Sequence, residues 1–481
     1  MGADCILWCP DVQVAPGRWK PSHQLGILYV GRVAAEGGHK VRFIRCGHDV
    51  EAVAEEVRRE RAGIVGISVT TSDWRSNLSL AAELCGRVKQ ISRGIRTVLG
   101  GIVPTMFAQE ILTRYGDVDI VVKGEGEQTF LEILRGEPSS DIAGIAWRDE
   151  DGAVRHGPAR RPLGDLDELP HAMAVETEGT ATTECAGLLG NVYYDSPTRC
   201  ASLLTSRGCE GQCTFCVNPW YYRPVRQRSI PNVLGEIRRL ACHGVRYLRI
   251  CDANFASDHA RVMDFCDAIE PFRMQWSCWQ RADMTDPGLY TAMRRAGCRI
   301  TTIGIESFDQ EIRNLRYRKN VPDEQLYQAV RYAAQAGIDT VGEIIIGHPL
   351  EDADRLRQGF DKARGILRYL DYVNISTLTV VPHTALWTQL TADMPEDRVA
   401  KLRLRSMFQC PSVWRFARNV DPGALESMSQ DYLRHVYHGP AYLLRQFTRT
   451  LAQRKRLTWF NRDRIVKTLL GKALRRVRRP R

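Results

Sequence analysis

Short apolar runs alternate with helical patterns along the first part of the chain. Residues 63–69 and 96–101 read as buried strands, and an amphipathic pattern over residues 78–91 separates them. Strands that alternate with helices are typical of parallel sheets covered on both faces. Residues 1–135 are therefore predicted to form a Rossmann-like α/β domain with a doubly wound parallel sheet. Such sheets bind ligands at the carboxyl ends of their strands.

The same alternation returns between residues 201 and 390. Strand patterns occur at residues 246–251, 275–279, 300–305, 340–346 and 372–380, with helical patterns such as 233–242 and 324–336 between them. These repeated βα units predict a partial (β/α)6 barrel. Residues 136–200 are irregular and are interpreted as a linker that contains one hairpin. Residues 391–481 are predicted to be a mainly helical C-terminal region.

Composition places the chain among ordinary globular proteins. Of its 481 residues, 44% are hydrophobic and 26% are charged, which is typical of that class. No apolar run approaches the roughly 18 residues of a membrane span. The first ten residues lack the basic and apolar regions of a signal peptide. A cytoplasmic location is expected.

The positive net charge is concentrated at the C-terminal end. The formal charge of the chain is +11, and residues 454–481 carry 12 Lys and Arg against one acid. The rest of the chain is balanced, so no nucleic-acid partner is expected. The basic segment alternates apolar and charged residues, as an amphipathic helix does. Such a helix either packs its apolar stripe on the body of the protein or makes a peripheral contact with an anionic membrane.

Fifteen cysteines occur in the chain, but only three lie close together. Cys209, Cys213 and Cys216 follow a short apolar run with spacings of Cys-x3-Cys-x2-Cys. Thiolates prefer iron–sulfur clusters or zinc. Three ligands in place of four leave one position of a metal centre open for a substrate or cofactor. A structural zinc site with a distant fourth ligand is the alternative.

The cysteine spacing, with Phe215 just before the third cysteine, resembles the signature of the radical S-adenosylmethionine (SAM) enzymes. The resemblance implies a [4Fe-4S] cluster on the three cysteines and SAM bound at the open iron. Reductive cleavage of SAM would give a 5′-deoxyadenosyl radical that abstracts hydrogen from a small-molecule substrate. An external electron donor, such as a flavodoxin, a ferredoxin or a dedicated reductase, is also implied.

Further segments are similar to the strand ends of that family, in the same order along the chain. They include Gly304–Ser307 and the Gly-x-Pro-x-Glu turn at residues 347–351. Any one of them alone is equally explained by a buried ion pair or a helix cap. Taken together, they imply that the SAM-contacting residues are Phe215, Asn254, Arg281, Glu306, Ser307 and Ile345.

Residues 20–135 resemble the cobalamin-binding domains that are fused to some radical SAM enzymes. No Asp-x-His-x-x-Gly motif occurs, so no histidine is expected as a lower axial ligand. Val103 stands where the family usually has a histidine, which leaves open a domain kept only for packing or substrate recognition. The resemblance implies that the cobalamin contacts are Ser68, Thr70, Gly100, Gly101, Gly124, Glu125 and Gly126.

Three residues are candidates for acid–base chemistry. Tyr222 follows the cysteines closely and could give a proton to a radical intermediate, or simply pack over the loop. Glu343 interrupts an apolar strand pattern, where a carboxylate is costly unless it is paired or functional. It faces either the barrel, to bind a cationic or hydroxyl-rich substrate, or a helix, to pair with an arginine. Asp252 has similar status.

Two reactions fit these features. The favoured one is cobalamin-dependent methyl transfer to an unactivated carbon of a natural product, sugar or lipid. The alternative is a cobalamin-independent dehydration of an aminoglycoside-type diol, as in some radical SAM dehydratases that are similar in layout, with Tyr222 as proton donor. A third class, a binding protein whose cluster only senses redox state, predicts no SAM cleavage at all.

Overall fold

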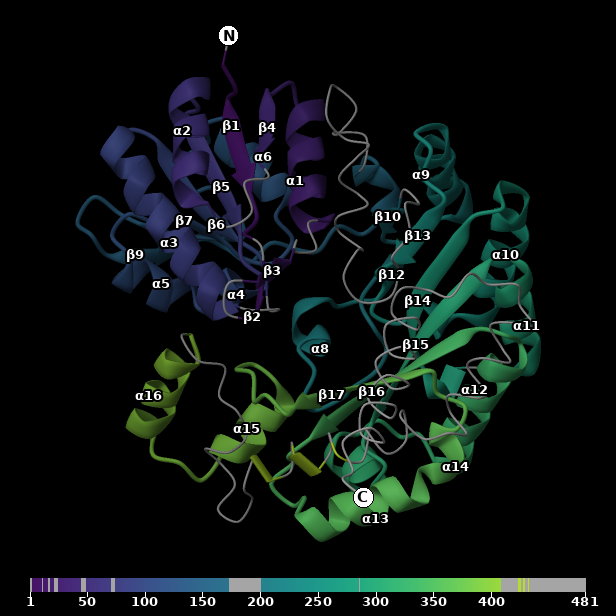
Figure 1. Ribbon diagram of the computed structural model, residues 1–481. Helices are drawn as coiled ribbons and strands as arrows, with labels where there is room; N and C mark the ends of the chain where they lie inside the picture. The colour runs from purple at the N-terminus through teal and green to yellow at the C-terminus, as the bar shows by residue number, and fades with distance from the viewer. Residues whose placement is uncertain are drawn as a thin grey trace, which may run out of the picture. The chain divides into compact units, whose positions relative to one another are not determined.

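The structure is a computed structural model of the chain (Figure 1). It describes residues 2–10, 12–15, 18–20, 25–44, 49–70, 74–172, 200–284 and 286–407, together with residues 423, 424, 427, 428 and 431. The basic segment at residues 454–481 and residues 173–199 of the predicted linker therefore lie outside the described residues. None of the described helices is both long and apolar enough to cross a membrane.

The N-terminal sheet has the strand order β4-β1-β5-β6-β7-β8-β9 within the described residues. Its first five strands are parallel, which confirms the predicted α/β domain. The last two strands form the predicted hairpin: β8 pairs antiparallel with β7, and β9 pairs antiparallel with β8, so the hairpin extends this sheet. The strands are β1 (Cys5–Trp8), β4 (Val41–Ile44), β5 (Ile64–Ser68), β6 (Arg96–Gly100), β7 (Ile120–Val122), β8 (Ile145–Arg148) and β9 (Val154–His156).

Helices cover both faces of this sheet. Successive strand residues point to opposite faces, so Ile6 and Leu7 of β1 belong to different apolar clusters. One cluster includes residues of α2 and α3, and the other includes residues of α1 and α6. The covering helices are α1 (Leu25–Glu36), α2 (Val50–Glu60), α3 (Trp74–Ile91), α4 (Ile102–Met106), α5 (Ala108–Arg114) and α6 (Glu127–Leu134).

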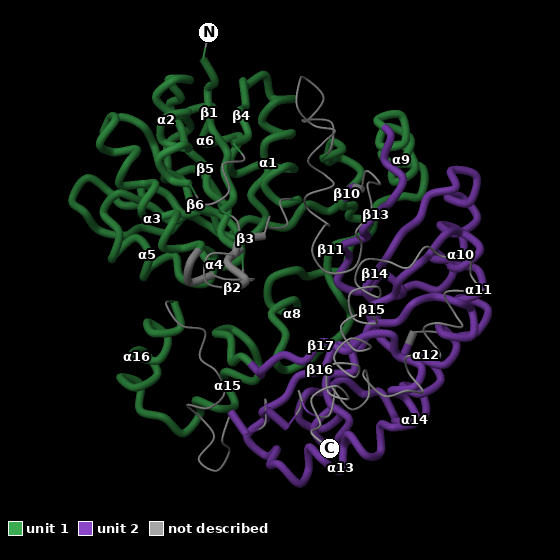
Figure 2. Tube along the Cα trace, viewed as in Figure 1, with its two compact units in different colours: residues 1–182, 202–243, 379–411 green, residues 183–201, 244–378, 412–481 purple. Residues whose placement is uncertain are grey.

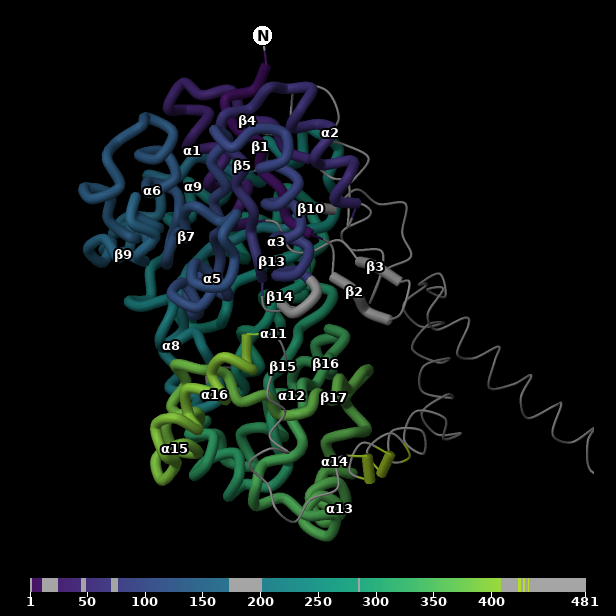
Figure 3. Tube along the Cα trace, turned by 90° about the vertical axis from the view of Figure 1, so that its left-hand side faces the viewer, coloured from purple at the N-terminus to yellow at the C-terminus, as the bar shows by residue number. Residues whose placement is uncertain are grey.

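The second sheet has the strand order β10-β13-β14-β15-β16-β17. From β13 onward the neighbours are parallel and follow one another in chain order, which confirms the predicted partial barrel. Figure 3 shows this succession from a second direction. The strands are β10 (Cys200–Leu203), β13 (Tyr247–Ile250), β14 (Gln275–Arg281), β15 (Cys298–Glu306), β16 (Asp339–Ile346) and β17 (Tyr372–Thr377).

Helices on one side of the second sheet bury its apolar residues. Ile303, Ile344 and Ile346 pack with Leu326 of α12 and Phe360 of α13. On the opposite side of β16 the side chains of Glu343 and Ile345 are only half-buried, because successive residues of a strand point to opposite faces. The helices are α10 (His259–Ile269), α11 (Pro287–Arg295), α12 (Asp323–Gln335), α13 (Ala353–Lys362) and α14 (Arg364–Leu367).

The chain divides into two compact units (Figure 2). Unit 1 contains residues 1–182, 202–243 and 379–411, and unit 2 contains residues 183–201, 244–378 and 412–481. The cysteine-bearing segment thus belongs to the same unit as the N-terminal sheet. The remaining elements of unit 1 are β2 (Val12–Ala15), β3 (Arg18–Lys20), β11 (Ser206–Arg207), α8 (Asn218–Tyr221), β12 (Arg226–Gln227), α9 (Ile230–Cys242), α15 (Ala385–Thr391) and α16 (Glu396–Ser406).

Candidate active site

The three cysteines lie in a closed loop, residues 206–229, hereafter the cysteine loop. Its base is the antiparallel pair β11–β12, in which Arg207 lies opposite Arg226. Gly208 has a φ of +102°, and a Cβ there would meet Tyr222 O at 2.8 Å. Only glycine fits such a position. The chain can therefore turn sharply from β11 into the cysteine segment.

Cys209, Cys213 and Cys216 are half-buried, and none of them is in a disulfide bond. The amide of Gly211 donates to Cys209 Sγ at 3.4 Å. Among the described His, Cys, Asp and Glu side chains, no group of three is placed to hold a single metal ion. A [4Fe-4S] cluster differs from a single ion because each thiolate binds a different iron, so its ligands need not meet at one point. Three thiolates from one short loop fit that cluster.

Four buried charges join the base of the cysteine loop to the N-terminal sheet. Arg226 Nη2 lies 2.6 Å from Glu125 Oε1, and Arg207 Nη2 lies 2.5 Å from Glu127 Oε1. Arg207 Nη1 also lies 3.4 Å from Glu125 Oε2. All four side chains are between 6% and 11% exposed. These residues are called the Arg–Glu cluster.

The Arg–Glu cluster gives Glu125 a partner that the sequence did not reveal. Burial alone would raise the pKa of Glu125, but the hydrogen bond from Arg226 and the charge of Arg207 hold it below its ordinary value. Burial alone would lower the pKa of Arg207, but the charges of Glu127 and Glu125 raise this pKa above its ordinary value. The predicted cobalamin contact at Glu125 is thus a carboxylate engaged by two arginines. Glu127 was given no role from the sequence.

Tyr221 connects the cysteine loop to two glycine turns at the sheet edge. Its hydroxyl donates to Gly124 O at 3.0 Å. The amide of Gly124 donates to Thr105 Oγ1 at 3.0 Å, and Thr105 Oγ1 donates to Gly101 O at 2.8 Å. Burial raises the pKa of Tyr221, although a side-chain hydrogen bond with Thr105 lowers it. One tyrosine of the cysteine loop therefore contacts the residues predicted to hold cobalamin.

Tyr222, the predicted proton donor, lies edge-on against Tyr221, with ring centroids 4.5 Å apart. Burial raises the pKa of Tyr222, and the nearby charge of Arg207 lowers it less. A raised pKa keeps the phenol protonated at neutral pH. This packing on Tyr221 agrees with the alternative that Tyr222 packs over the loop, and the proton-donor role stays a prediction.

The carboxyl ends of β5, β6 and β7 gather the other predicted cobalamin contacts. Ser68 pairs with Gly100 in the sheet, and a Cβ on Gly101 would meet Val69 O at 2.7 Å. Gly101 and Gly124 have φ values of +102° and +79°. Around Gly124, a Cβ would meet no atom within 4 Å. The turns at Gly101 and Gly124 thus suit glycine, and the second leaves room beside the backbone for a ligand.

Buried polar atoms without partners lie in the same domain. Thr70 Oγ1, and both Oδ1 and Nδ2 of the fully buried Asn77, have no hydrogen-bond partner in the part of the chain that the structure describes. Buried polar groups are nearly always hydrogen-bonded in native proteins. These atoms therefore fit a ligand with polar groups, such as cobalamin. Asn77 was not identified from the sequence, because an asparagine in an amphipathic helix gives no signal of burial.

In unit 2, Asn254 and Arg281 come together at the ends of neighbouring strands. Asn254 Oδ1 accepts from the amide of Arg281 at 3.1 Å, and Asn254 Nδ2 is buried without a partner among the described residues. The guanidinium of Arg281 donates to Asp283 and, from Nη2, to Lys319 O at 2.5 Å. Asp252 is 2% exposed beside them along the chain. A buried donor at this edge fits a polar ligand such as SAM.

Glu306 ends β15 at an irregularity in the pairing with β16. Its φ of +65° is in the left-handed region, which is strained for a residue other than glycine. Glu306 Oε1 lies 2.7 Å from Lys319 Nζ, and the lysine side chain is 4% exposed. Lys319 was missed, because the sequence around it reads as an exposed basic turn. Ser307 follows Glu306 and is also buried.

Glu343 points away from the covering helices, which decides between the two orientations left open by the sequence. Ile344 and Ile346 pack on the helix side, so Glu343 and the half-buried Ile345 lie on the opposite, barrel-facing side. Glu343 Oε1 accepts from Asn374 Nδ2 of β17 at 2.9 Å. Burial, followed by the charge of Glu306, raises the pKa of Glu343. Its partner is an amide, not an arginine.

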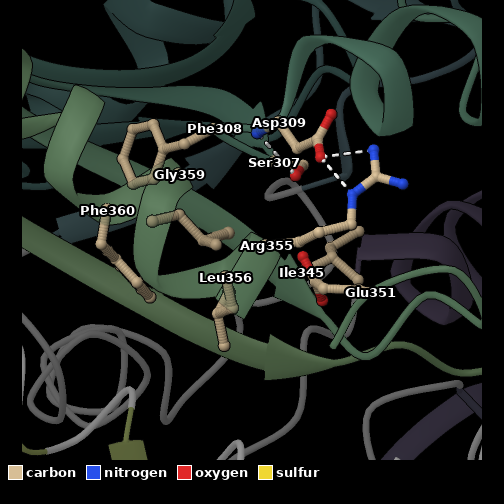
Figure 4. A pocket seen from close by; sticks show the side chains of 10 residues that line it. Ser307, Phe308, Asp309, Ile345, Glu351, Arg355, Leu356, Gly359 and Phe360 are labelled. Atoms are coloured by element: carbon tan, nitrogen blue, oxygen red, sulfur yellow. Dashed lines mark hydrogen bonds and ion pairs between the residues drawn. The ribbon is translucent and has the colours of Figure 1, made fainter. Parts of the chain in front are cut away.

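A small pocket lies where the ends of β15 and β16 approach α13 (Figure 4). Arg355 Nε donates to Asp309 Oδ2 at 2.8 Å at its rim. Glu351 is 2% exposed and accepts from the amide of Gly347. Burial raises the pKa of Glu351 from 4.5 to about 7. This carboxyl group therefore titrates in the folded protein close to neutral pH.

Replacing Glu351 with glutamine should make the stability of unit 2 less dependent on pH. A raised pKa in the folded state stabilises the fold below about pH 4.5, and this contribution is lost as the pH rises through about 7. Glutamine keeps an acceptor for Gly347 but cannot ionise. The variant and the parent should melt together at pH 4, and the variant should melt higher at pH 8. Thermal unfolding measured across this range tests the expectation, with the exposed Glu324→Gln as control; parallel curves for Glu351→Gln and the parent would contradict it.

Comparison with known proteins agrees with this geometry. The chain matches the B12 binding domain family over residues 20–134 and the Radical SAM superfamily over residues 203–358. The cytidylyl-2-hydroxyethylphosphonate methyltransferase of Streptomyces wedmorensis is 27% identical over 383 residues, which cover 68% of this chain and 69% of that protein. The anaerobic magnesium-protoporphyrin IX monomethyl ester cyclase of Rubrivivax gelatinosus is 25% identical over 459 residues, covering 92% and 78%.

The fold is also similar to that of a solved structure. The radical S-adenosylmethionine methyltransferase TsrM from Kitasatospora setae, with cobalamin and a [4Fe-4S] cluster bound, has a TM-score of 0.65 to this chain. The two are 19% identical, and the match covers 81% of this chain and 78% of that chain. At this level of identity the likeness concerns the fold, in which a B12-type domain and a radical SAM barrel occur in one chain.

Proposed function

The chain is a radical SAM enzyme with an N-terminal B12-binding domain, and from this premise we propose that it transfers a methyl group to an unactivated carbon of a small-molecule substrate. The expectation of cobalamin, which the sequence alone left open, is confirmed by the match to the B12 binding domain family. The similarity to a cobalamin-bound fold and to a curated methyltransferase supports methyl transfer over dehydration.

One observation carries this proposal. The cysteine loop and the glycine turns at the carboxyl edge of the N-terminal sheet belong to one unit and are joined by Tyr221 and the Arg–Glu cluster. When bound, the [4Fe-4S] cluster supplies the electron that cleaves SAM, and cobalamin carries the methyl group. A domain kept only for packing would not need unpartnered buried polar atoms such as those of Asn77.

Different residues of the chain bind the cluster, SAM and the substrate. Cys209, Cys213 and Cys216 hold the cluster, and the buried donor of Asn254 with the neighbouring Arg281 binds polar groups of SAM. Glu343, on the barrel-facing side of β16 beside Asn374, accepts a hydrogen bond from a hydroxyl or amine of the substrate. The electron comes from an external donor, for which a flavodoxin, a ferredoxin or a dedicated reductase is suitable.

Removing cobalamin should separate the two candidate reactions without knowledge of the substrate. Cobalamin-loaded protein, incubated anaerobically with SAM and dithionite, should form S-adenosylhomocysteine, because this thioether is what remains of SAM once its methyl group has been transferred. The same protein without cobalamin should form only 5′-deoxyadenosine and methionine. Chromatography of the nucleosides, with cobalt and iron analysis of the protein, measures both outcomes.

A dehydratase would behave differently in this experiment. It would give 5′-deoxyadenosine at the same rate with and without cobalamin, and no S-adenosylhomocysteine. A product of an added diol that is lighter by one water would then identify the alternative reaction. A protein that cleaves no SAM under strong reductant would contradict both enzymatic hypotheses and leave a redox-sensing role.

A further inference from the structure

The four-residue segment Gly124–Glu127 belongs to the predicted cobalamin site and also contacts the cysteine loop. It follows β7 at the carboxyl edge of the N-terminal sheet, where cobalamin is expected to bind. Its two glycines and Glu125 belong to the predicted cofactor site. Its two glutamates, Glu125 and Glu127, bind Arg226 and Arg207 at the base of the cysteine loop. A displacement of this segment therefore affects both sites.

Tyr221 adds a second connection between the same two sites. It lies five residues after Cys216, at the end of α8. Its hydroxyl bonds to Gly124 O, and Thr105 links Gly124 to Gly101. The turns after β6 and β7 are thus in one hydrogen-bonded network with the loop that carries the cluster ligands.

The Arg–Glu cluster favours two discrete arrangements over a continuum. Its two positive and two negative charges neutralise each other while less than 12% exposed. Moving one partner away leaves a buried charge without compensation, which is strongly unfavourable. The structure shows the cysteine loop docked with all four charges paired, and an undocked loop would place these charges in water. Coupling between sites requires an element with such a pair of states.

We propose that Tyr221 and the Arg–Glu cluster make cobalamin binding and cluster retention reciprocally coupled: each cofactor stabilises the docked cysteine loop on which the other depends. This inference rests on the proposed function in that both cofactors must bind. Thermodynamic linkage requires that the factor by which the cluster raises cobalamin affinity equals the factor by which cobalamin raises cluster affinity. In coupled sites, binding of one ligand typically changes the affinity for the other by about 5- to 150-fold. We expect a change of about tenfold here.

The test compares hydroxocobalamin affinity in the presence and absence of the cluster. The full-length protein is titrated anaerobically with hydroxocobalamin, once with the reconstituted cluster and once after iron removal, and binding is followed by absorbance and quenching of tryptophan fluorescence. The parent should bind hydroxocobalamin about tenfold more tightly with its cluster than without it. Tyr221→Phe and Glu127→Gln should reduce this ratio to about two or less.

The chain offers a matched control on the same helix. Glu132 of α6 is paired with Arg160, at 16% and 19% exposure, and this pair lies within the N-terminal domain without a partner in the cysteine loop among the described residues. Glu132→Gln should keep the parent ratio even if it lowers stability. Tyr221→Phe removes only one hydroxyl, so it decides the matter if Glu127→Gln fails to fold.

The reverse direction gives an independent measurement. Iron release to a chelator should be slowed by hydroxocobalamin in the parent and in Glu132→Gln, and should be unaffected by it in Tyr221→Phe. Equal cobalamin affinities with and without the cluster in the parent would overturn the coupling while leaving the proposed function intact. Absence of any cobalamin binding would overturn the proposed function and, with it, the coupling. A ratio lost equally in Glu132→Gln and Tyr221→Phe would reduce the effect to general stability and also overturn it.

Discussion

Replacing Cys213 with serine is expected to remove the bound iron and abolish SAM cleavage. The three thiolates act on one cluster, and a hydroxyl is a poor ligand for the iron that Cys213 would bind. Because residues that act as a unit have non-additive effects, changing all three cysteines should be no worse than changing one. Iron and sulfide analysis, the absorbance of the cluster and the yield of 5′-deoxyadenosine measure the loss.

Cys242 supplies the control for this experiment. It belongs to the same unit, at the C-terminal end of α9, and its side chain is exposed. Cys242→Ser should keep the iron content and SAM cleavage of the parent. Parent-like iron content in Cys213→Ser would contradict the assignment of the cluster ligands and, with it, the whole mechanism. Equal losses in both variants would indicate a general sensitivity to cysteine replacement.

Replacing Lys319 with methionine is expected to destabilise unit 2 by about 3–5 kcal/mol, because it leaves the buried Glu306 carboxylate without its cation. The lysine side chain is 4% exposed and lies 2.7 Å from that carboxylate. Its backbone carbonyl also accepts from Arg281, so the predicted SAM edge should loosen at the same time. Hydrogen exchange of β15 and β16, together with chemical unfolding, measures the change.

An exposed ion pair nearby gives the comparison. Arg316 and Glu311 lie 3.1 Å apart at 48% and 42% exposure. Arg316→Met should change stability by less than about 1 kcal/mol, as exposed pairs generally do. The double variant Lys319→Met, Glu306→Gln should recover most of the loss, because no buried charge then remains. A Lys319→Met variant as stable as Arg316→Met would show that Glu306 does not depend on this lysine.

The position of Glu343 bears on the choice of substrate. The carboxyl group of Glu343 lies on the barrel-facing side of β16 and is bonded to Asn374, and burial raises its pKa. Covering such a polar group with an apolar surface is unfavourable, whereas a hydrogen-bonding group can satisfy it. The proposed role of Glu343 thus predicts a substrate with a hydroxyl or amino group.

Local sequence was sufficient for the features that depend on neighbours along the chain. Cys209, Cys213 and Cys216 lie within eight residues, so the local sequence predicts one metal centre, and its resemblance to the radical SAM signature implies the cluster. The alternation of strands and helices is also a local pattern, and it predicted both parallel sheets. The strand β1 was not predicted, because four apolar residues next to the N-terminus resemble a buried helix segment as much as a strand.

The connections that turn these parts into a site were decided only by the tertiary structure. Glu125 and Arg226 are separated by 101 residues, and Tyr221 and Gly124 by 97 residues. No periodicity encodes such contacts, since they depend on where the β11–β12 pair rests on the N-terminal sheet. The orientation of Glu343 and the burial of Lys319 likewise depend on which face of a strand or turn the packing covers. The chain's own residues thus specify its chemistry locally, whereas long-range packing determines which of the candidate groups bind a cofactor and which bind each other.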